Sequence, residues 1–272
     1  MPIIGERRDM ASRPVTALHV DIHEGPPPAL LLVHGLLSSR AQWRPNLSGL
    51  SEVCTPIVVE LLGHGRSPSP ADPAAYAVEA YVDAFEEVRA GLGLERWFVC
   101  GQSFGAGLTL RYALAHPDRV AGQVFTNSMS GLAPPGRDDA AQRKARAEAF
   151  RRGGRAALEA MPLYPRGSRR WPAEVSRGLV EDAALLSAEG VANAIAYTLD
   201  GLSMAEDLAG LTMPSLLVNG RREAAFQPLR DLAAARLPGL EIVDLDGGHS
   251  INLDCPEAFN AAVAEFIRRH SG

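Results

Sequence analysis

Residues 97–112, WFVCGQSFGAGLTLRY, constrain the fold of this chain more than any other stretch. A short apolar run meets the sequence GQSFG, and a stretch of small and apolar residues with helical character follows. This order predicts a buried strand that turns sharply into a helix, with Ser103 at the apex of the turn. Such a turn strains the backbone of Ser103 and presents its hydroxyl outward, while the glycines on either side let strand and helix approach closely. A glycine/serine turn without a chemical role is the alternative, and it requires that partner residues be missing.

The length and composition of the chain favour one large α/β domain with room for an inserted subdomain. The 272 residues are 46% hydrophobic, yet no apolar run is about 18 residues long, the length that a membrane helix needs. The N-terminus lacks the apolar core of a signal peptide, so we expect neither secretion nor membrane insertion. Cys54, Cys100 and Cys255 are widely spaced and form no metal-ligand pattern. They predict a reducing compartment, hence the cytoplasm, and argue against structural zinc.

Charge is distributed unevenly along the chain. The net charge of −5 gives no reason to expect a nucleic-acid partner. Residues 133–180, however, hold eleven basic and five acidic side chains, a local net charge of +6. One interpretation is a solvated, arginine-rich surface. The other is a field that draws an anionic substrate toward a pocket.

The first half of the chain alternates strands and helices. Strands are predicted at 15–22, 29–33, 54–61, 97–100 and 120–126, and helices at 42–50, 74–92 and 106–115. We expect the first two strands to pair as a hairpin. The remaining alternation predicts a mostly parallel sheet with right-handed crossovers, whose ligand site lies beyond the carboxyl ends of its strands.

The alternation stops at about residue 133 and resumes near residue 211. Between them only helical stretches occur, at about 138–151, 153–161, 172–187 and 188–199. A strand at 214–220, a helix near 228–236, a strand at 241–245 and a closing helix at about 256–269 follow. We therefore predict an α/β core made of residues 1–132 and 211–272, with residues 133–210 inserted as a helical cap.

A second strand-end motif, His34-Gly35, introduces a loop of small and apolar residues. The backbone N–H of Leu36 in this loop could point toward the same pocket as the N–H of Phe104, next to the serine. Two such donors would hold the oxyanion that forms when a serine attacks a carbonyl carbon. An ordinary turn at a strand end is the alternative interpretation of His34-Gly35.

A serine hydroxyl needs a base, and the base needs an orienting acid. Among seven histidines, His249 follows a late strand on a glycine-rich loop, from which an imidazole can reach another strand. The acid is expected after the strand at 214–220, where Glu223 is the first carboxylate. Asp246 is the second candidate, although it lies only three residues before His249. A solvated surface glutamate remains the alternative for Glu223.

These motifs resemble those of the α/β-hydrolase superfamily over essentially the whole chain. The resemblance rests on His34-Gly35, the loop GHGRS at 63–67, GQSFG at 101–105, Gly248-His249, and the order nucleophile, acid, base. It implies an eight-stranded, mostly parallel sheet with a helical lid, and a serine–histidine–acid triad that works without a cofactor. The acid position usually holds aspartate, whereas here it holds Glu223. A serine at the turn argues against dehalogenases and epoxide hydrolases, which carry aspartate there.

The leading functional hypothesis is a carboxylic ester hydrolase that acts on a small-molecule acyl substrate through an acyl-enzyme. Ser103, His249 and Glu223 form its predicted triad, and the N–H groups of Leu36 and Phe104 its oxyanion hole. A thioesterase, a C–C bond hydrolase or a lyase could use the same triad on an anionic substrate. A ligand receptor without turnover is the third possibility. The sequence does not reveal the substrate or the oligomeric state.

Overall fold

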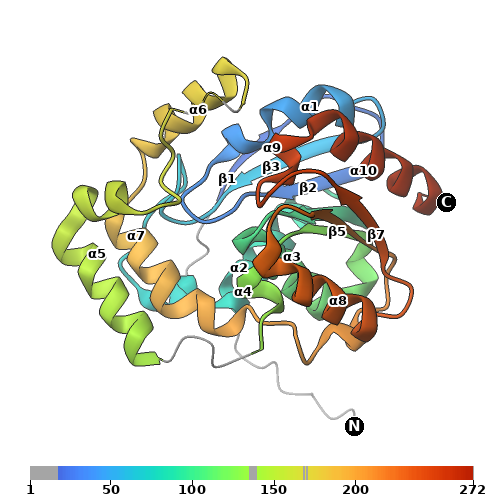
Figure 1. The fold of residues 1–272 in the computed structure, drawn as a ribbon. Coiled ribbons are helices and arrows are strands. Elements are labelled where there is room, and N and C mark those ends of the chain that lie inside the picture. Colours follow the sequence, from blue (N-terminus) through green and yellow to red (C-terminus); the bar gives the residue numbers. More distant parts are fainter. Residues whose placement is uncertain (1–17, 135–139, 168, 170, 272) are drawn as a thin grey trace, which may run out of the picture.

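The computed structural model describes residues 18–134, 140–167, 169 and 171–271. These residues form an α/β/α sandwich in which helices cover both faces of one central sheet (Figure 1). The sheet has seven strands in the order β1-β3-β2-β4-β5-β6-β7. The strands are β1 (His19–Ile22), β2 (Ala29–Val33), β3 (Thr55–Glu60), β4 (Trp97–Gly101), β5 (Val120–Thr126), β6 (Ser215–Gly220) and β7 (Glu241–Leu245).

All neighbouring strands run parallel except β1, which pairs antiparallel with β3. The predicted hairpin between the first two strands is therefore wrong. Residue Val20 lies opposite Val59 of β3, and β3 separates β1 from β2. Local alternation in the sequence identified both strands, but it carries no information about which strand lies beside which. Residues 15–17 of the predicted first strand lie outside the described residues, and the described part of the sheet has seven strands rather than the eight expected.

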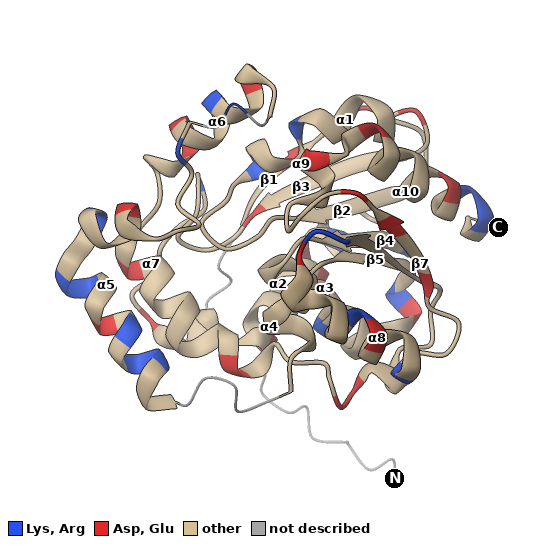
Figure 2. Ribbon diagram, viewed as in Figure 1, with Lys and Arg blue, Asp and Glu red and all other residues tan. Residues whose placement is uncertain are grey.

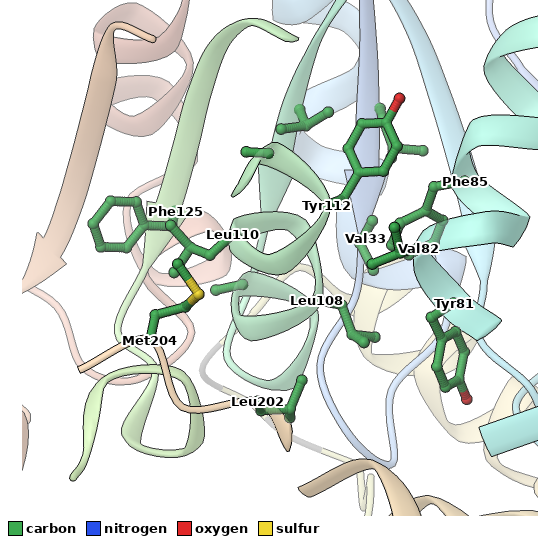
Figure 3. Close-up of a cluster of buried hydrophobic side chains, with 14 of the residues drawn as sticks. Val33, Tyr81, Val82, Phe85, Leu108, Leu110, Tyr112, Phe125, Leu202 and Met204 are labelled. Carbon is green, nitrogen blue, oxygen red and sulfur yellow. The ribbon is translucent and has the colours of Figure 1, made fainter. Parts of the chain in front are cut away.

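Alternate residues of the central strands pack against different helix layers. In β2, Leu31 and Val33 belong to one buried cluster, while Leu30 and Leu32 belong to the cluster on the opposite face. Both sides of the strand are therefore covered, which explains why its sequence is continuously apolar rather than alternating. Figure 3 shows the first of these clusters, where side chains from the strands meet those of the helices beside them.

Ten α-helices are present among the described residues. They are α1 (Arg44–Leu50), α2 (Val78–Gly91), α3 (Phe104–Ala115), α4 (Met129–Leu132), α5 (Ala140–Ala160), α6 (Ala173–Ala183), α7 (Ala188–Asn193), α8 (Gln227–Arg236), α9 (Ile251–Asp254) and α10 (Pro256–His270). Within the described ranges, no helix is both long enough and apolar enough to cross a membrane.

Helices α5, α6 and α7 lie between β5 and β6 in the sequence and to one side of the sheet (Figure 1). Helix α5 consists of two helical segments that meet at a kink at Gly154, whose φ is +55°, in agreement with the two helices predicted at 138–151 and 153–161. Residues 138–139 of the first prediction lie outside the described residues. A glycine can adopt this conformation at little steric cost. Helix α6 ends at Ala183, earlier than predicted, and α7 passes into a turn of π-helix at 194–198.

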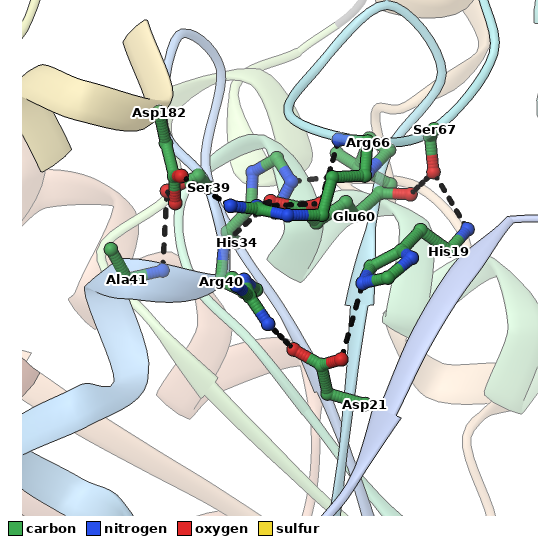
Figure 4. A network of polar contacts seen from close by, with 11 residues as sticks. His19, Asp21, His34, Ser39, Arg40, Ala41, Glu60, Arg66, Ser67 and Asp182 are labelled. Carbon is green, nitrogen blue, oxygen red and sulfur yellow. Dashed lines mark hydrogen bonds and ion pairs between the residues drawn. The ribbon is translucent and has the colours of Figure 1, made fainter. Parts of the chain in front are cut away.

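Helix α6 is tied to the rim of the sheet by a buried polar network (Figure 4). Asp182 of α6 accepts hydrogen bonds from Ser39 Oγ at 2.7 Å and from Arg66 Nη2 at 3.0 Å. Arg66 also donates to Glu60, the fully buried last residue of β3. A buried carboxylate is expensive unless it is paired, so these contacts fix α6 against the loops that follow β2 and β3.

Candidate active site

Ser103 lies in the sharp turn between β4 and α3. Its φ is +54° and its ψ is −113°, a region that residues with a side chain rarely adopt. Such a conformation costs on the order of 1–3 kcal/mol and persists only where the surrounding structure enforces it. The strained turn expected for residues 101–105 is thus present.

The glycines that flank the serine allow the chain to pack closely. A Cβ atom on Gly105 would lie 2.4 Å from the carbonyl oxygen of Val33 and 2.5 Å from that of His34. A Cβ atom on Gly101 would lie 2.4 Å from the carbonyl oxygen of Gly105. Because backbone atoms cannot move away independently, both positions exclude any larger residue.

Replacing Gly105 with alanine should lower the free energy of unfolding by about 1–3 kcal/mol, since the added methyl overlaps the end of β2. Urea-induced unfolding of both proteins measures the difference. Gly91 at the end of α2 provides the matched control, because a Cβ atom there meets nothing within 4 Å. Gly91→Ala should leave stability unchanged or raise it slightly. Equal losses in the two variants would contradict this account of the turn.

The backbone N–H groups of Leu36 and Phe104 are candidates for an oxyanion hole. Both residues line a cavity that contains Ser103, and within the described part of the chain neither N–H donates to a protein acceptor. Phe104 is the first residue of α3, where the partial positive charge of the helix N-terminus lies. Two unused donors next to a serine hydroxyl suit a developing negative charge.

Two buried histidines hold the loop that carries Leu36. The Nε2 atom of His64 accepts the N–H of Leu37 at 3.1 Å, and that of His34 accepts the N–H of Leu61 at 3.0 Å. Burial lowers the pKa of His34 to about 4 and that of His64 to about 3, so both rings are neutral and can accept these bonds. Their other ring nitrogens donate to backbone carbonyls. The histidine in the GHGRS loop is therefore a structural support for the loop after β2.

His249 and Glu223 are in direct contact. The Nδ1 atom of His249 lies 3.0 Å from both carboxylate oxygens of Glu223. Burial raises the pKa of Glu223, but the hydrogen bond and charge of His249, together with a hydrogen bond from Asn127, outweigh it and hold that pKa below its usual value. An ionised carboxylate only accepts hydrogen bonds, so Nδ1 of His249 carries the proton and Nε2 is left as the basic nitrogen.

Asp246, the second candidate for the acid, makes a different contact. Its carboxylate accepts two hydrogen bonds from Arg222, at 3.0 and 2.6 Å, and its side chain is 63% exposed. The structure therefore brings Glu223 to His249 and leaves Asp246 in an exposed ion pair.

Asn127, Ser128 and Gln102 support this arrangement, and the sequence prediction did not include them. Asn127 donates to Glu223 at 2.8 Å and to the Gly220 carbonyl at 3.0 Å. Ser128 Oγ donates to the carbonyl oxygen of Ser103 at 2.6 Å, and Gln102 Nε2 donates to that of His249 at 3.1 Å. Polar residues directly after the buried strand β5 were the available signal, because a buried polar group at a strand end needs a partner.

Ser103 opens onto two cavities. The first, of about 500 Å³, is lined on one side by α4 and α5, through residues such as Met129, Arg143 and Arg146. The second, of about 420 Å³, is lined by residues 162–166 and by Trp171, among others. His249 lines both cavities, so the serine and the histidine share one site. The described residues contain no group of three or more His, Cys, Asp or Glu side chains placed to hold a metal ion.

Residues 28–256 match the family model described as the alpha/beta hydrolase fold. This match covers most of the chain. The chain belongs to the α/β-hydrolase family. Among its relatives is a hydrolase of Caulobacter sp. (strain K31) with 31% identity over 278 aligned positions, covering 95% of this chain and 98% of the relative. This relative is named as a carbamate hydrolase, RutD, and the name itself gives the activity as provisional.

Solved structures of α/β hydrolases have the same fold. The enol-lactonase from Burkholderia xenovorans LB400 superposes with a TM-score of 0.77 at 24% identity, over 92% of this chain and 96% of that one. MenH from S. aureus superposes with a TM-score of 0.78 at 17% identity, over 93% and 99% of the two chains. The relatives in this α/β-hydrolase family include proteins named as hydrolases, and at these identities the structural likeness bears on the fold.

Proposed function

We propose that this α/β hydrolase is a serine hydrolase that cleaves carboxylic esters of small to medium molecules. One observation carries the proposal: Ser103, at a strained turn, opens onto the same cavities as His249, whose Nδ1 lies 3.0 Å from Glu223. Nucleophile, base and orienting acid are the three groups that acyl transfer by a serine requires.

In the proposed mechanism, Nε2 of His249 takes the proton of Ser103 as its oxygen attacks the acyl carbon. The N–H groups of Leu36 and Phe104 hold the negative oxygen of the tetrahedral intermediate. The imidazolium, stabilised by Glu223, then protonates the leaving alcohol and an acyl-enzyme remains. Water activated by the same histidine releases the acid and restores the serine.

A second candidate is a reaction on an anionic substrate by the same triad, as in a thioesterase, a C–C bond hydrolase or a lyase. Figure 2 shows several positions along α5 that are occupied by basic residues, and Arg143 and Arg146 of this helix line the larger cavity. Arg143 also pairs with Asp200 at 2.5 Å, which offsets one of these charges. We place the neutral ester first because apolar residues dominate the rest of this lining.

A substrate panel at two salt concentrations tests the proposal and separates it from the alternatives. The panel holds p-nitrophenyl esters, thioesters, lactones and carbamates, each with a neutral and an anionic member. We expect sustained turnover of neutral esters, with kcat/KM changing less than about two-fold between 0.05 and 0.5 M salt, because screening affects only charged partners. A steep loss for anionic members alone would favour the second candidate. Binding without repeated turnover of any member would indicate a receptor.

A further inference from the structure

The two cavities meet at four shared lining residues. Three of them, Leu36, Ser103 and His249, belong to the proposed catalytic machinery. The fourth, Leu163, comes from the segment between α5 and α6. Among the residues that the structure describes, Leu163 is thus the one shared lining residue without a role in the proposed chemistry.

Leu163 is exposed, whereas the nearby Met161 and Tyr164 are partly buried. Met161 and Tyr164 pack against the apolar cluster formed by α5 and α7, whereas the side chain of Leu163 is absent from that cluster and is 57% exposed. The hydrophobic effect disfavours such exposure of a leucine unless another group covers it. The space that it faces is the junction of the two cavities.

The segment that carries Leu163 is held in place. The Tyr164 N–H donates to the Met161 carbonyl at 3.1 Å, and Arg166 Nη1 donates to the same carbonyl at 3.2 Å. Arg155 of α5 donates to the Tyr164 hydroxyl at 3.3 Å. With its neighbours anchored on both sides, the Leu163 side chain is presented from a fixed position rather than from a free loop.

Both cavities are bounded by large apolar side chains. The larger contains Met129 and Leu199, and the smaller contains Trp171, Leu179 and Leu253. Each is large enough for several carbon atoms. A substrate cleaved at Ser103 therefore has room for a substantial apolar group on each side of the scissile bond.

The geometry points to Leu163 as a specificity-determining residue that separates the acyl side from the alcohol side of the substrate, each of which occupies one cavity. This inference rests on the proposed ester hydrolysis. The preferred substrates are esters with a medium-sized apolar group on both sides of the ester bond. The leucine side chain sets how far a chain in one cavity can extend into the other.

The test uses p-nitrophenyl esters of linear acids from acetate to dodecanoate. Leu163→Ala should raise the ratio of kcat/KM for decanoate to kcat/KM for acetate about ten-fold, and Leu163→Trp should lower it by a similar factor, since a few methylenes in an apolar pocket carry selectivity of this size. Leu185, an exposed leucine outside both cavities, provides the control variant Leu185→Ala, whose ratio should not change.

Equal decanoate-to-acetate ratios in all four proteins would overturn the role of Leu163. A separate measurement distinguishes this failure from failure of the proposed function. Calorimetric titration with decyl phenyl ether, which cannot be hydrolysed, measures the Kd for binding in the cavities whether or not the protein hydrolyses esters. Tighter binding to Leu163→Ala and weaker binding to Leu163→Trp would support the partition even if wild type hydrolysed no ester. Equal Kd values would refute it.

Discussion

Replacing Ser103 with alanine should reduce kcat for ester hydrolysis by about 10⁴- to 10⁶-fold, because the variant lacks the hydroxyl on which the proposed acyl-enzyme forms. Alanine keeps the Cβ atom and hence the same backbone preference, so the variant should fold and unfold as the wild type does. Initial rates with a p-nitrophenyl ester at saturating substrate measure the loss. A fluorophosphonate should label the wild-type peptide that contains Ser103 with one adduct, which mass spectrometry detects, and it should not label the same peptide of the variant.

Because Ser103 and His249 act in the same proton transfer, the rate of a double variant provides a second test. If the histidine acts only by taking the proton of the serine, the double variant with His249→Ala should be no slower than Ser103→Ala alone. Ser51 at the end of α1 lies away from both cavities, and Ser51→Ala is the control for an ordinary serine. Turnover by Ser103→Ala within ten-fold of wild type would show that acyl transfer does not pass through this residue.

The central sheet could be predicted from the sequence because its strands are buried on both faces. The continuous apolar run 29–33 indicates such a strand regardless of its neighbours, and it has the predicted bounds. The strand at 120–126, which is mostly apolar, also has the predicted bounds. The predicted pairing of β1 with β2 was wrong because strand pairing depends on which strands become neighbours in the folded sheet. This is a non-local property that the local sequence does not determine. The boundary between the two helices near residues 152–153 was predictable because glycines interrupt the helical pattern there, and the kink lies at Gly154.

The candidate site was predictable to the extent that its chemistry dictates residue types. Ser103 and His249 lie on loops that follow β4 and β7, and parallel strands bring such loops to one edge of the sheet. Strands β5 and β6 lie between them, so the two side chains reach one site across the intervening strand ends. Asn127 was missed because its place after a buried strand indicates only that it needs a hydrogen-bond partner, and that this partner is Glu223 follows from the three-dimensional structure. Leu163 could not be recognised either, because the cavities that it lines form only when the inserted helices pack on the sheet.

Glu223→Gln should lower kcat for ester hydrolysis by about 10²- to 10⁴-fold while leaving KM nearly unchanged. The neutral amide cannot stabilise the imidazolium, and its N–H₂ group can donate to Nδ1 of His249, which favours the tautomer whose Nε2 is already protonated. A histidine in that tautomer cannot accept the proton of Ser103. Steady-state kinetics of both proteins at neutral pH measure the loss.

The charge of Glu223 also gives the variant a signature in its stability. Because the pKa of Glu223 is lowered by folding, its contribution to the free energy of unfolding is present at neutral pH and is lost as the pH falls through the folded-state pKa. The difference in unfolding free energy between wild type and Glu223→Gln should therefore shrink from pH 7 toward pH 3. A difference that is constant across this range would mean that the carboxylate is not ionised against His249.

Two further variants decide whether Glu223 is the acid that orients His249. Asp246→Asn removes the second candidate for the acid, which is exposed and paired with Arg222, so activity should remain within about two-fold of wild type. Glu223→Asp keeps the charge but shortens the side chain by one methylene, so it should recover part of the activity that Glu223→Gln loses. If Asp246→Asn were the slower variant, the acid would be Asp246, and the 3.0 Å contact between Glu223 and His249 would have no part in the reaction. These variants separate the effect of the negative charge from that of the side-chain length. An intermediate rate for Glu223→Asp together with a low rate for Glu223→Gln would show that the acid needs both.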